Sequence, residues 1–172
     1  MASATFKNPA GELIDIHSGG VDLKFPHHDN EIAQTEAFSD TDEWSKYWFH
    51  TGHLNIKGQK MSKSEKNFIT IKDFMTEFNH REMRFLFLLN QWDGLMNYNP
   101  DTSLTEPRAK DKQFSNFFTT VKGILKNSHG KITTLEMKFN EKDFELNNLF
   151  IDKQSLIHHH LSNNFDTPNA IN

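Results

Sequence analysis

The sequence predicts a mixed α/β fold, with short strands in the first half of the chain and long helices in the second. An alternating pattern at 13–17, followed by the Ser-Gly-Gly segment 18–20, indicates a strand that ends where glycine allows a close approach or a sharp turn. A second strand candidate covers 53–57. Apolar residues recur with helical i, i+3, i+4 spacing at 114–125 and again at 146–161. Together these segments place an α/β part before a helical part.

Helix starts are marked by capping residues along the chain. Pro26 suits the first position of a helix, because it lacks the backbone N–H that would be unpaired there. Polar caps predict further helix starts at 40–43, 70–73 and 79–82. The segment 83–89 after the last cap is predicted to be a buried helix, because apolar residues cover most of its faces.

Bulky apolar residues supply the predicted core. Aromatic residues follow the cap at 40–43, and we expect them to be buried: Trp44, Tyr47, Trp48 and Phe49. The stripe on the first long helix is interpreted as core packing rather than as a surface for stacking bases: Phe114, Phe117, Phe118, Val121, Ile124 and Leu125. After a loop at 127–134, a last helix is expected at about 141–163, with apolar residues on one side: Leu146, Leu149, Phe150, Leu156, Ile157 and Leu161.

Composition and charge exclude several classes of protein. With 172 residues the chain is one domain or parts of two, long enough for a real core. The net charge of −4 gives no general signal for nucleic-acid binding, so any affinity for anions must be local. The chain has no cysteine, which excludes disulfides and thiolate metal ligands within these residues. No apolar run could span a membrane, so we expect a soluble, intracellular protein.

Local positive charge is concentrated around the segment Lys60-Met61-Ser62-Lys63-Ser64. Five lysines lie between 57 and 72: Lys57, Lys60, Lys63, Lys66 and Lys72. The segment follows a strand candidate and precedes a helix start, so it is predicted to be a mobile cationic loop. Ammonium groups suit a polyphosphate whose charge grows as a bond breaks. A solvated surface loop is the alternative explanation of this segment taken alone.

A second chemical pattern lies upstream, in the helix predicted from Pro26. His27 and Glu31 are four residues apart and therefore share one helix face, where an imidazole and a carboxylate can share a metal. His28 and Asn30 are expected to point elsewhere. A polar surface helix is the alternative, and two ligands do not complete a zinc site, which normally has four. The strand, glycine segment and following Asp22 are typical of α/β sheets that bind nucleotides at strand ends.

The two motifs together, GGVDLKFPHHDNEIAQ at 19–34 and KMSKS at 60–64, resemble the cysteinyl-tRNA synthetases, which are class I aminoacyl-tRNA synthetases. The resemblance is dense from about 15 to 74 and thinner to the end of the chain. It implies an incomplete Rossmann-type catalytic half at 1–75 that contains the KMSKS loop. A helical stem-contact region at 76–134 and the start of a further helical domain at 135–172 would follow.

The resemblance also implies roles for individual residues. Lys60 and Lys63 would be catalytic, stabilising the pyrophosphate that leaves ATP. The implied ATP-binding residues are Gly19, Gly20, Asp22, Lys60, Met61, Ser62, Lys63 and Ser64. Asp22 would hold the ribose hydroxyls or the substrate ammonium, and His17 would line the amino-acid pocket. His27 and Glu31 match two of the four ligands of a zinc ion that binds the substrate thiol, and Mg²⁺ would accompany ATP.

The implied activity is that of a cytoplasmic cysteine–tRNA ligase, with ATP, L-cysteine and tRNA(Cys) as substrates. The family's His-Ile-Gly-His signature and its two cysteine ligands do not occur in the 172 residues. We therefore expect a middle piece of a longer enzyme that is inactive alone and does not retain zinc. Two alternatives stay open: an ATP-dependent cysteine ligase of thiol-cofactor synthesis, and a non-catalytic RNA-contacting module.

Overall fold

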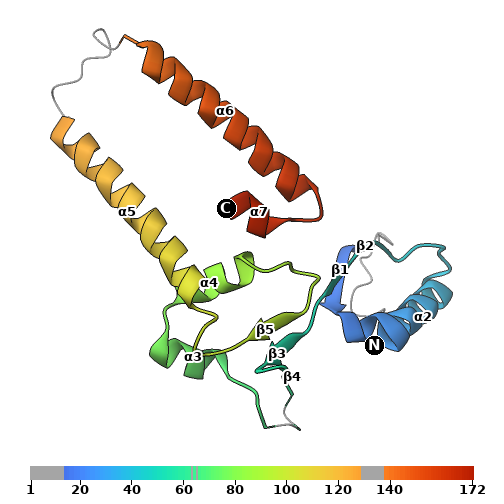
Figure 1. Cartoon of the computed structure of the whole chain (residues 1–172). Coiled ribbons are helices and arrows are strands. Elements are labelled where there is room, and N and C mark those ends of the chain that lie inside the picture. Colours follow the sequence, from blue (N-terminus) through green and yellow to red (C-terminus); the bar gives the residue numbers. More distant parts are fainter. Residues whose placement is uncertain (1–13, 63, 65, 129–137) are drawn as a thin grey trace. The chain divides into compact units, whose positions relative to one another are not determined.

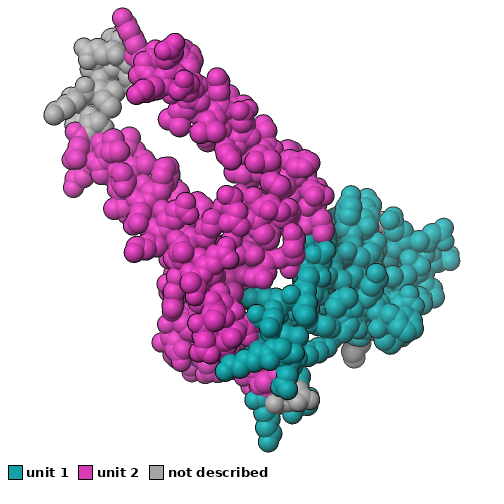
Figure 2. All heavy atoms as spheres, viewed as in Figure 1, with its two compact units in different colours: residues 1–66, 92–97 teal, residues 67–91, 98–172 magenta. Residues whose placement is uncertain are grey.

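The computed structural model describes residues 14–62, 64, 66–128 and 138–172. The chain divides into two compact units: residues 1–66 with 92–97 form unit 1, and residues 67–91 with 98–172 form unit 2 (Figure 2). The short strands lie between residues 14 and 98 and the two long helices follow from residue 105, which confirms the mixed α/β prediction. No helix among the described residues is long and apolar enough to cross a membrane.

A parallel strand pair and one helix make up most of unit 1. β1 (Ile14–Gly20) pairs in parallel with β2 (Ser45–Thr51), with Ile16 opposite Tyr47 and Gly20 opposite Thr51. The chain between them forms η1 (Val21–Leu23), the kinked segment η2 (Lys24–His28) and α2 (Asp29–Ser39). Helix α2 lies beside the two strands (Figure 1). The strand predicted at 13–17 is confirmed over its described residues and continues through both glycines.

The helix predicted from the cap at 40–43 is wrong. Asp40 instead ends α2 in the left-handed conformation, with φ of 53°. β2 follows, because its backbone pairs with β1 and its side chains alternate between two faces. The aromatic residues here differ in burial: Trp44, just before the strand, is 6% exposed, whereas Tyr47 is 61% exposed and is not core as predicted.

A tight hairpin precedes the lysine-rich segment. β3 (Leu54–Ile56) and β4 (Gln59–Lys60) are antiparallel, and β5 (Met96–Tyr98) lies on the other side of β3. The two turn residues, Lys57 and Gly58, have φ of 49° and 83°, the combination that two-residue hairpins favour. The lysine-rich segment therefore does not begin as a loop directly after the predicted strand. The chain turns back instead, and Lys60 belongs to a paired strand.

Unit 2 begins with two capped helices. α3 (Ile71–Glu77) and α4 (His80–Leu88) start at the predicted caps, and the Asn79 side chain accepts from the backbone N–H of Glu82 at 3.0 Å. Four apolar residues form the buried core of this region: Phe74, Leu86, Tyr98 and Leu104. The prediction that the whole segment 83–89 is buried is wrong, because only Leu86 is buried there and Phe87 is 53% exposed.

The long helices of unit 2 expose most of their apolar side chains. The first turns of α5 (Thr105–Ser128) contact α4, where Arg108 lies 2.9 Å from Glu82 and the Phe114 ring stacks on Phe85. Further along the helix four residues of the predicted core stripe are exposed, which corrects that prediction: Phe117, Phe118, Ile124 and Leu125. These residues lie beyond the part of α5 that contacts α4.

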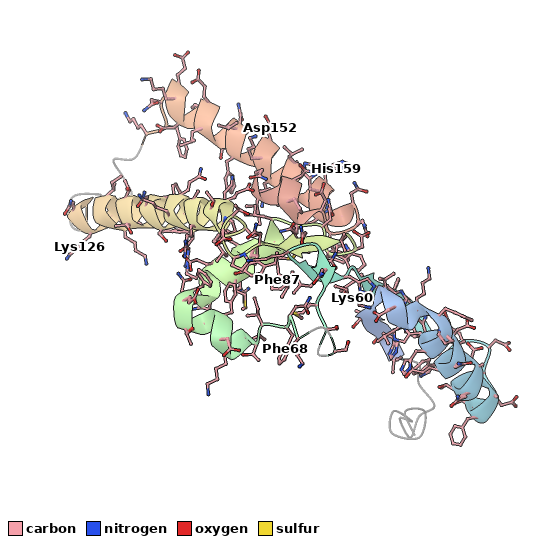
Figure 3. All side chains as sticks on the ribbon, turned by 60° about the horizontal axis from the view of Figure 1, so that its bottom comes forward. Lys60, Phe68, Phe87, Lys126, Asp152 and His159 are labelled. Atoms are coloured by element: carbon pink, nitrogen blue, oxygen red, sulfur yellow. The ribbon has the colours of Figure 1, made fainter. Side chains whose placement is uncertain are left out.

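Helix α6 (Glu141–Ser162) has almost the predicted bounds. Its apolar residues are 41–66% exposed, including all six of the predicted apolar side: Leu146, Leu149, Phe150, Leu156, Ile157 and Leu161. Figure 3 shows side chains standing out around both long helices, near Lys126 and Asp152. A short helix, α7 (Thr167–Ile171), follows with Asp166 as its N-cap.

Candidate functional site

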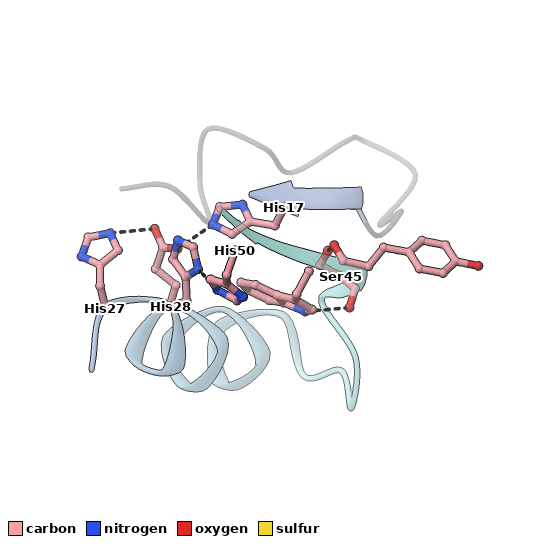
Figure 4. Close-up of polar contacts among 8 residues, drawn as sticks. His17, His27, His28, Ser45 and His50 are labelled. Atoms are coloured by element: carbon pink, nitrogen blue, oxygen red, sulfur yellow. Dashed lines mark hydrogen bonds and ion pairs between the residues drawn. The ribbon is translucent and has the colours of Figure 1, made fainter. Parts of the chain in front are cut away.

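The Glu31 carboxylate lies between two imidazoles, one from strand β1 and one from η2, just before its own helix. The Nε2 atom of His17 on β1 lies 2.8 Å from Oε2 of Glu31 on α2, and the carboxylate accepts the proton of that hydrogen bond. The other carboxylate oxygen, Oε1, lies 3.5 Å from Nε2 of His27, one helical turn earlier (Figure 4). The predicted neighbours His27 and Glu31 are thus brought together, with His17 beside them.

His28 also belongs to this group, and the expectation that it points elsewhere is wrong. Its side chain is buried, at 3% exposure, with Nδ1 2.9 Å from Nε2 of His50 on β2. The His28 ring can be buried here because residue 19 is glycine: a Cβ atom at that position would come within 2.8 Å of the ring. The glycine therefore makes room for an imidazole.

Burial determines the protonation of His28. The pKa of His28 is lowered from its ordinary value of 6.5, first because burial disfavours the charged ring and then because His17 is close. A neutral imidazole can donate with one nitrogen and accept with the other, as the contact with His50 requires. The interior of this group is therefore polar and carries no charge on His28 at neutral pH.

Two tryptophans surround the imidazoles. The His17 ring lies 5.0 Å from Trp44 and 4.8 Å from Trp48, and Trp48 stacks on His50 with ring centres 6.4 Å apart. The Trp48 indole N–H donates to the backbone carbonyl of Ser45 at 3.2 Å, which fixes the ring. Sequence reasoning missed His28, Trp48 and His50 as site residues. The signal for the last two was available, since residues two apart on a strand share a face.

The donor atoms of this group fit a divalent metal. Among the described residues, ligand atoms of His17, His28 and Glu31 lie within 4.8 Å of one another. Imidazole nitrogen and carboxylate oxygen are ligands that zinc takes, with three protein ligands and one open position in catalytic sites. A metal bound between His17 and Glu31 would replace the proton they share. The chain offers no thiolate ligand, because it has no cysteine.

The predicted ATP-site residues lie at the end of β1 and on the hairpin. Gly19 and Gly20 are the last residues of β1, and the Asp22 carboxylate that follows lies 3.3 Å from the ammonium of Lys60 on β4. The pKa of Asp22 is lowered by a hydrogen bond from its own backbone N–H and then by that with Lys60. Lys63 lies outside the described residues, and the hydroxyls of Ser62 and Ser64 are 3.0 Å apart.

A known protein family matches the part of the chain that holds the site. A family model described as "tRNA synthetases class I (C) catalytic domain" matches residues 1–109, which include all the residues of the site. The chain belongs to this family.

Individual relatives are 45–47% identical to this chain over most of its length. Cysteine–tRNA ligase, cytoplasmic, of Xenopus laevis is 47% identical over 91% of the chain, and that of Gallus gallus is 45% identical over 94%. The human protein of the same name is 46% identical over 91%. The chain spans about a fifth of the length of these relatives, 21% in each case.

Proposed function

We propose that this chain forms part of a cysteine–tRNA ligase, which uses ATP to activate cysteine and transfers it to tRNA(Cys) in the cytoplasm. One observation carries the proposal: β1 connects both halves of the site. It holds His17 against Glu31, and its end places Asp22 against Lys60. The strand ends in glycine, with the histidine and carboxylate group on one side and the cationic hairpin on the other. This arrangement suits an amino acid bound at the first and the triphosphate of ATP bound at the second.

The triphosphate end is assigned to the lysine segment. Lys60 and Lys63 would stabilise the pyrophosphate as it leaves, with Mg²⁺ accompanying ATP, because fixed positive charge lowers the energy of a transition state in which negative charge develops. Met61, Ser62 and Ser64 would shape the loop around the phosphates. Gly19 and Gly20 would let the nucleotide approach the strand end, and Asp22 would bind the ribose hydroxyls or the cysteine ammonium.

The amino-acid end is assigned to the group around Glu31. His17 would line the pocket, and His27 and Glu31 would hold a zinc ion with two ligands from outside these 172 residues. Zinc, when bound, converts a thiol to a thiolate and so distinguishes cysteine from serine. In this chain alone we predict no stoichiometric zinc, because His27 and Glu31 are only two of the four ligands that zinc normally takes. Elemental analysis of the purified chain tests this, and one zinc per chain would contradict it.

The domain assignment is part of the proposal. Residues 1–75 would be the second half of a Rossmann-type catalytic domain, 76–134 a helical stem-contact region, and 135–172 the start of a further helical domain. The parallel β1–α2–β2 unit supports the first part, because parallel strands joined by a helix are the building unit of such domains. The names of the relatives do not favour the two alternative functions.

A chimeric enzyme tests the proposed function. The matching segment of the Xenopus laevis ligase is replaced by this chain, and cysteine-dependent exchange of pyrophosphate into ATP is measured. We expect exchange with cysteine and not with serine. Lys63→Ala should lower the rate on the order of 10²–10³-fold, as for loss of one transition-state contact, and Lys57→Ala should leave it unchanged. An unchanged rate in Lys63→Ala would contradict the proposal.

A further inference from the structure

Asp22 lies where three segments of unit 1 meet. Its Oδ2 atom is 3.3 Å from Nζ of Lys60 on β4, and its Oδ1 atom is 3.9 Å from Nδ1 of His53, just before β3. The carboxylate is folded back over Gly20, where an added Cβ atom would come within 2.5 Å of Oδ1. The position of the carboxylate therefore depends on the glycine as well as on its charged neighbours.

The backbone of Lys60 is fixed independently of this ion pair. Lys60 is paired with Asn55 across the hairpin, and the next backbone N–H, of Met61, donates to the Leu54 carbonyl at 3.0 Å. The turn is held from outside as well, since the Asn97 side chain accepts from the N–H of Gly58 at 2.8 Å. A change of partner by Lys60 therefore moves its flexible side chain and leaves the hairpin in place.

We propose that Asp22 is a positioning residue that holds the Lys60 ammonium in the ligand-free protein and yields it to a polyphosphate. The identity of the polyphosphate as ATP rests on the proposed function; the exchange itself does not. Both side chains are about half exposed, at 51% and 53%, so water screens the pair and its contribution is small. A weak pair can align a lysine and still be displaced by a ligand with several negative charges.

Chemical labelling of lysines tests the resting contact. The full chain is acetylated briefly without ligand, and the extent at each lysine is measured by mass spectrometry. An ammonium paired with a carboxylate reacts slowly, so Asp22→Asn should speed labelling of Lys60 about two- to fivefold, the range of an exposed ion pair. Lys57, at the turn of the same hairpin, is the internal control and should not change. Equal labelling of Lys60 in both proteins would overturn the proposal.

Gly20→Ala provides a second variant that keeps the charge. Its φ of −71° suits alanine, so the added methyl group acts mainly by displacing the Asp22 carboxylate. Labelling of Lys60 should rise as in Asp22→Asn. Slow labelling that persists in a folded Gly20→Ala protein, checked by circular dichroism, would contradict the geometry on which the proposal rests.

Binding of two ligands, inorganic triphosphate and ATP, tests the exchange of partners by Lys60 separately from the proposed function. Inorganic triphosphate lacks a ribose, so Asp22→Asn should bind it up to about fivefold more tightly, because the competing carboxylate is gone. If Asp22 also binds the ribose of ATP, the affinity of Asp22→Asn for ATP should rise less than its affinity for triphosphate, or should fall. Triphosphate affinity that is unmeasurable or unchanged in Asp22→Asn would overturn the exchange. Tighter binding of triphosphate without measurable binding of ATP would support the exchange and contradict the proposed function.

Discussion

Side-chain burial differs between the group around Glu31 in unit 1 and the long helices of unit 2. The first buries polar residues: His28 is almost inaccessible, and its ring and that of His17 contact other imidazoles and indoles. The second exposes apolar residues, with Phe117 60% exposed on α5 and Phe150 62% exposed on α6. One region is closely packed and chemically specific, and the other presents apolar surface.

The two regions therefore differ in how much their stability depends on individual side chains. In unit 1 each buried polar group meets a partner, and none of the buried side-chain nitrogen or oxygen atoms in the described residues lacks one. Small changes there should therefore be costly. In the described part of α5 beyond Phe114, removal of a large side chain should cost little, because little is packed against it.

The largest effect is expected from one added methyl group in unit 1. Gly52 donates its N–H to the Trp92 carbonyl at 3.0 Å, and a Cβ atom there would overlap the carbonyl of Gly94. Because backbone cannot give way as a side chain can, Gly52→Ala should lower the free energy of unfolding by about 3 kcal/mol or more. Gly58→Ala is the matched control. It meets open space and costs only about 1–2 kcal/mol for its φ of 83°.

Gly19→Ala should come next. Its methyl group would meet the buried His28 ring at 2.8 Å and the Leu23 side chain at 3.0 Å, and overpacking of this kind costs about 1–3 kcal/mol. Urea unfolding measured by tryptophan fluorescence would detect it, because Trp48 lies 5.3 Å from His28. Full stability of Gly19→Ala would show that His28 does not lie under this strand.

A smaller effect is expected at Asp166, a partly buried polar contact in unit 2. Asp166 accepts from the side chains of Asn169 at 2.7 Å and Gln91 at 3.0 Å, and the first of these is the main cause of its lowered pKa. Asp166→Asn should lower the urea midpoint by less than Gly19→Ala. Since the folded pKa lies below the ordinary 3.8, this stabilisation is complete above pH 3.8 and is lost as the pH falls through the folded value.

The difference between the wild type and Asp166→Asn should accordingly be constant near neutral pH and shrink in acid. Urea unfolding of both proteins over a range of pH measures it. A difference that grows as the pH falls would have the wrong sign and would exclude a stabilising carboxylate at this position.

The smallest effect is expected on the exposed stripe of α5. Phe118→Ser should change the free energy of unfolding by no more than about 0.5 kcal/mol, as is usual for surface positions. Phe114→Ser is the matched control, because that ring stacks on Phe85 and its loss should be costly. If Phe118→Ser destabilises as much as Phe114→Ser, then α5 is covered in solution and the contrast between the two regions disappears.

Local signals in the sequence predicted local structure well. The caps at Thr70 and Asn79 start helices as predicted, because each side chain accepts from a backbone N–H three residues on. The same signal at 40–43 failed, because Asp40 ends α2 and β2 follows. The hairpin was missed because Lys57, at a position with positive φ, gives no sequence signal for a turn beyond the glycine that follows. The exposure of α5 and α6 could not be predicted, because periodicity identifies an apolar face but not what covers it.

The site shows the same limit. The pair His27 and Glu31 follows from helical spacing alone and is found together. His28 joins the group only because β1 crosses above it with glycine at position 19, a long-range contact that spacing does not reveal. The partner of Asp22 likewise depends on the hairpin, which brings Lys60 to it from 38 residues away in sequence.

The most direct test of the closely packed group is the titration of His28. Proton NMR resolves histidine ring signals, and comparison with His28→Gln assigns the one that matters among ten. The titration is done with a chelator present. Burial predicts a midpoint for His28 below 6.5, so the ring stays neutral as the pH falls through that value. A midpoint at or above 6.5 would mean that His28 is solvated, and the packed site described for unit 1 would be wrong.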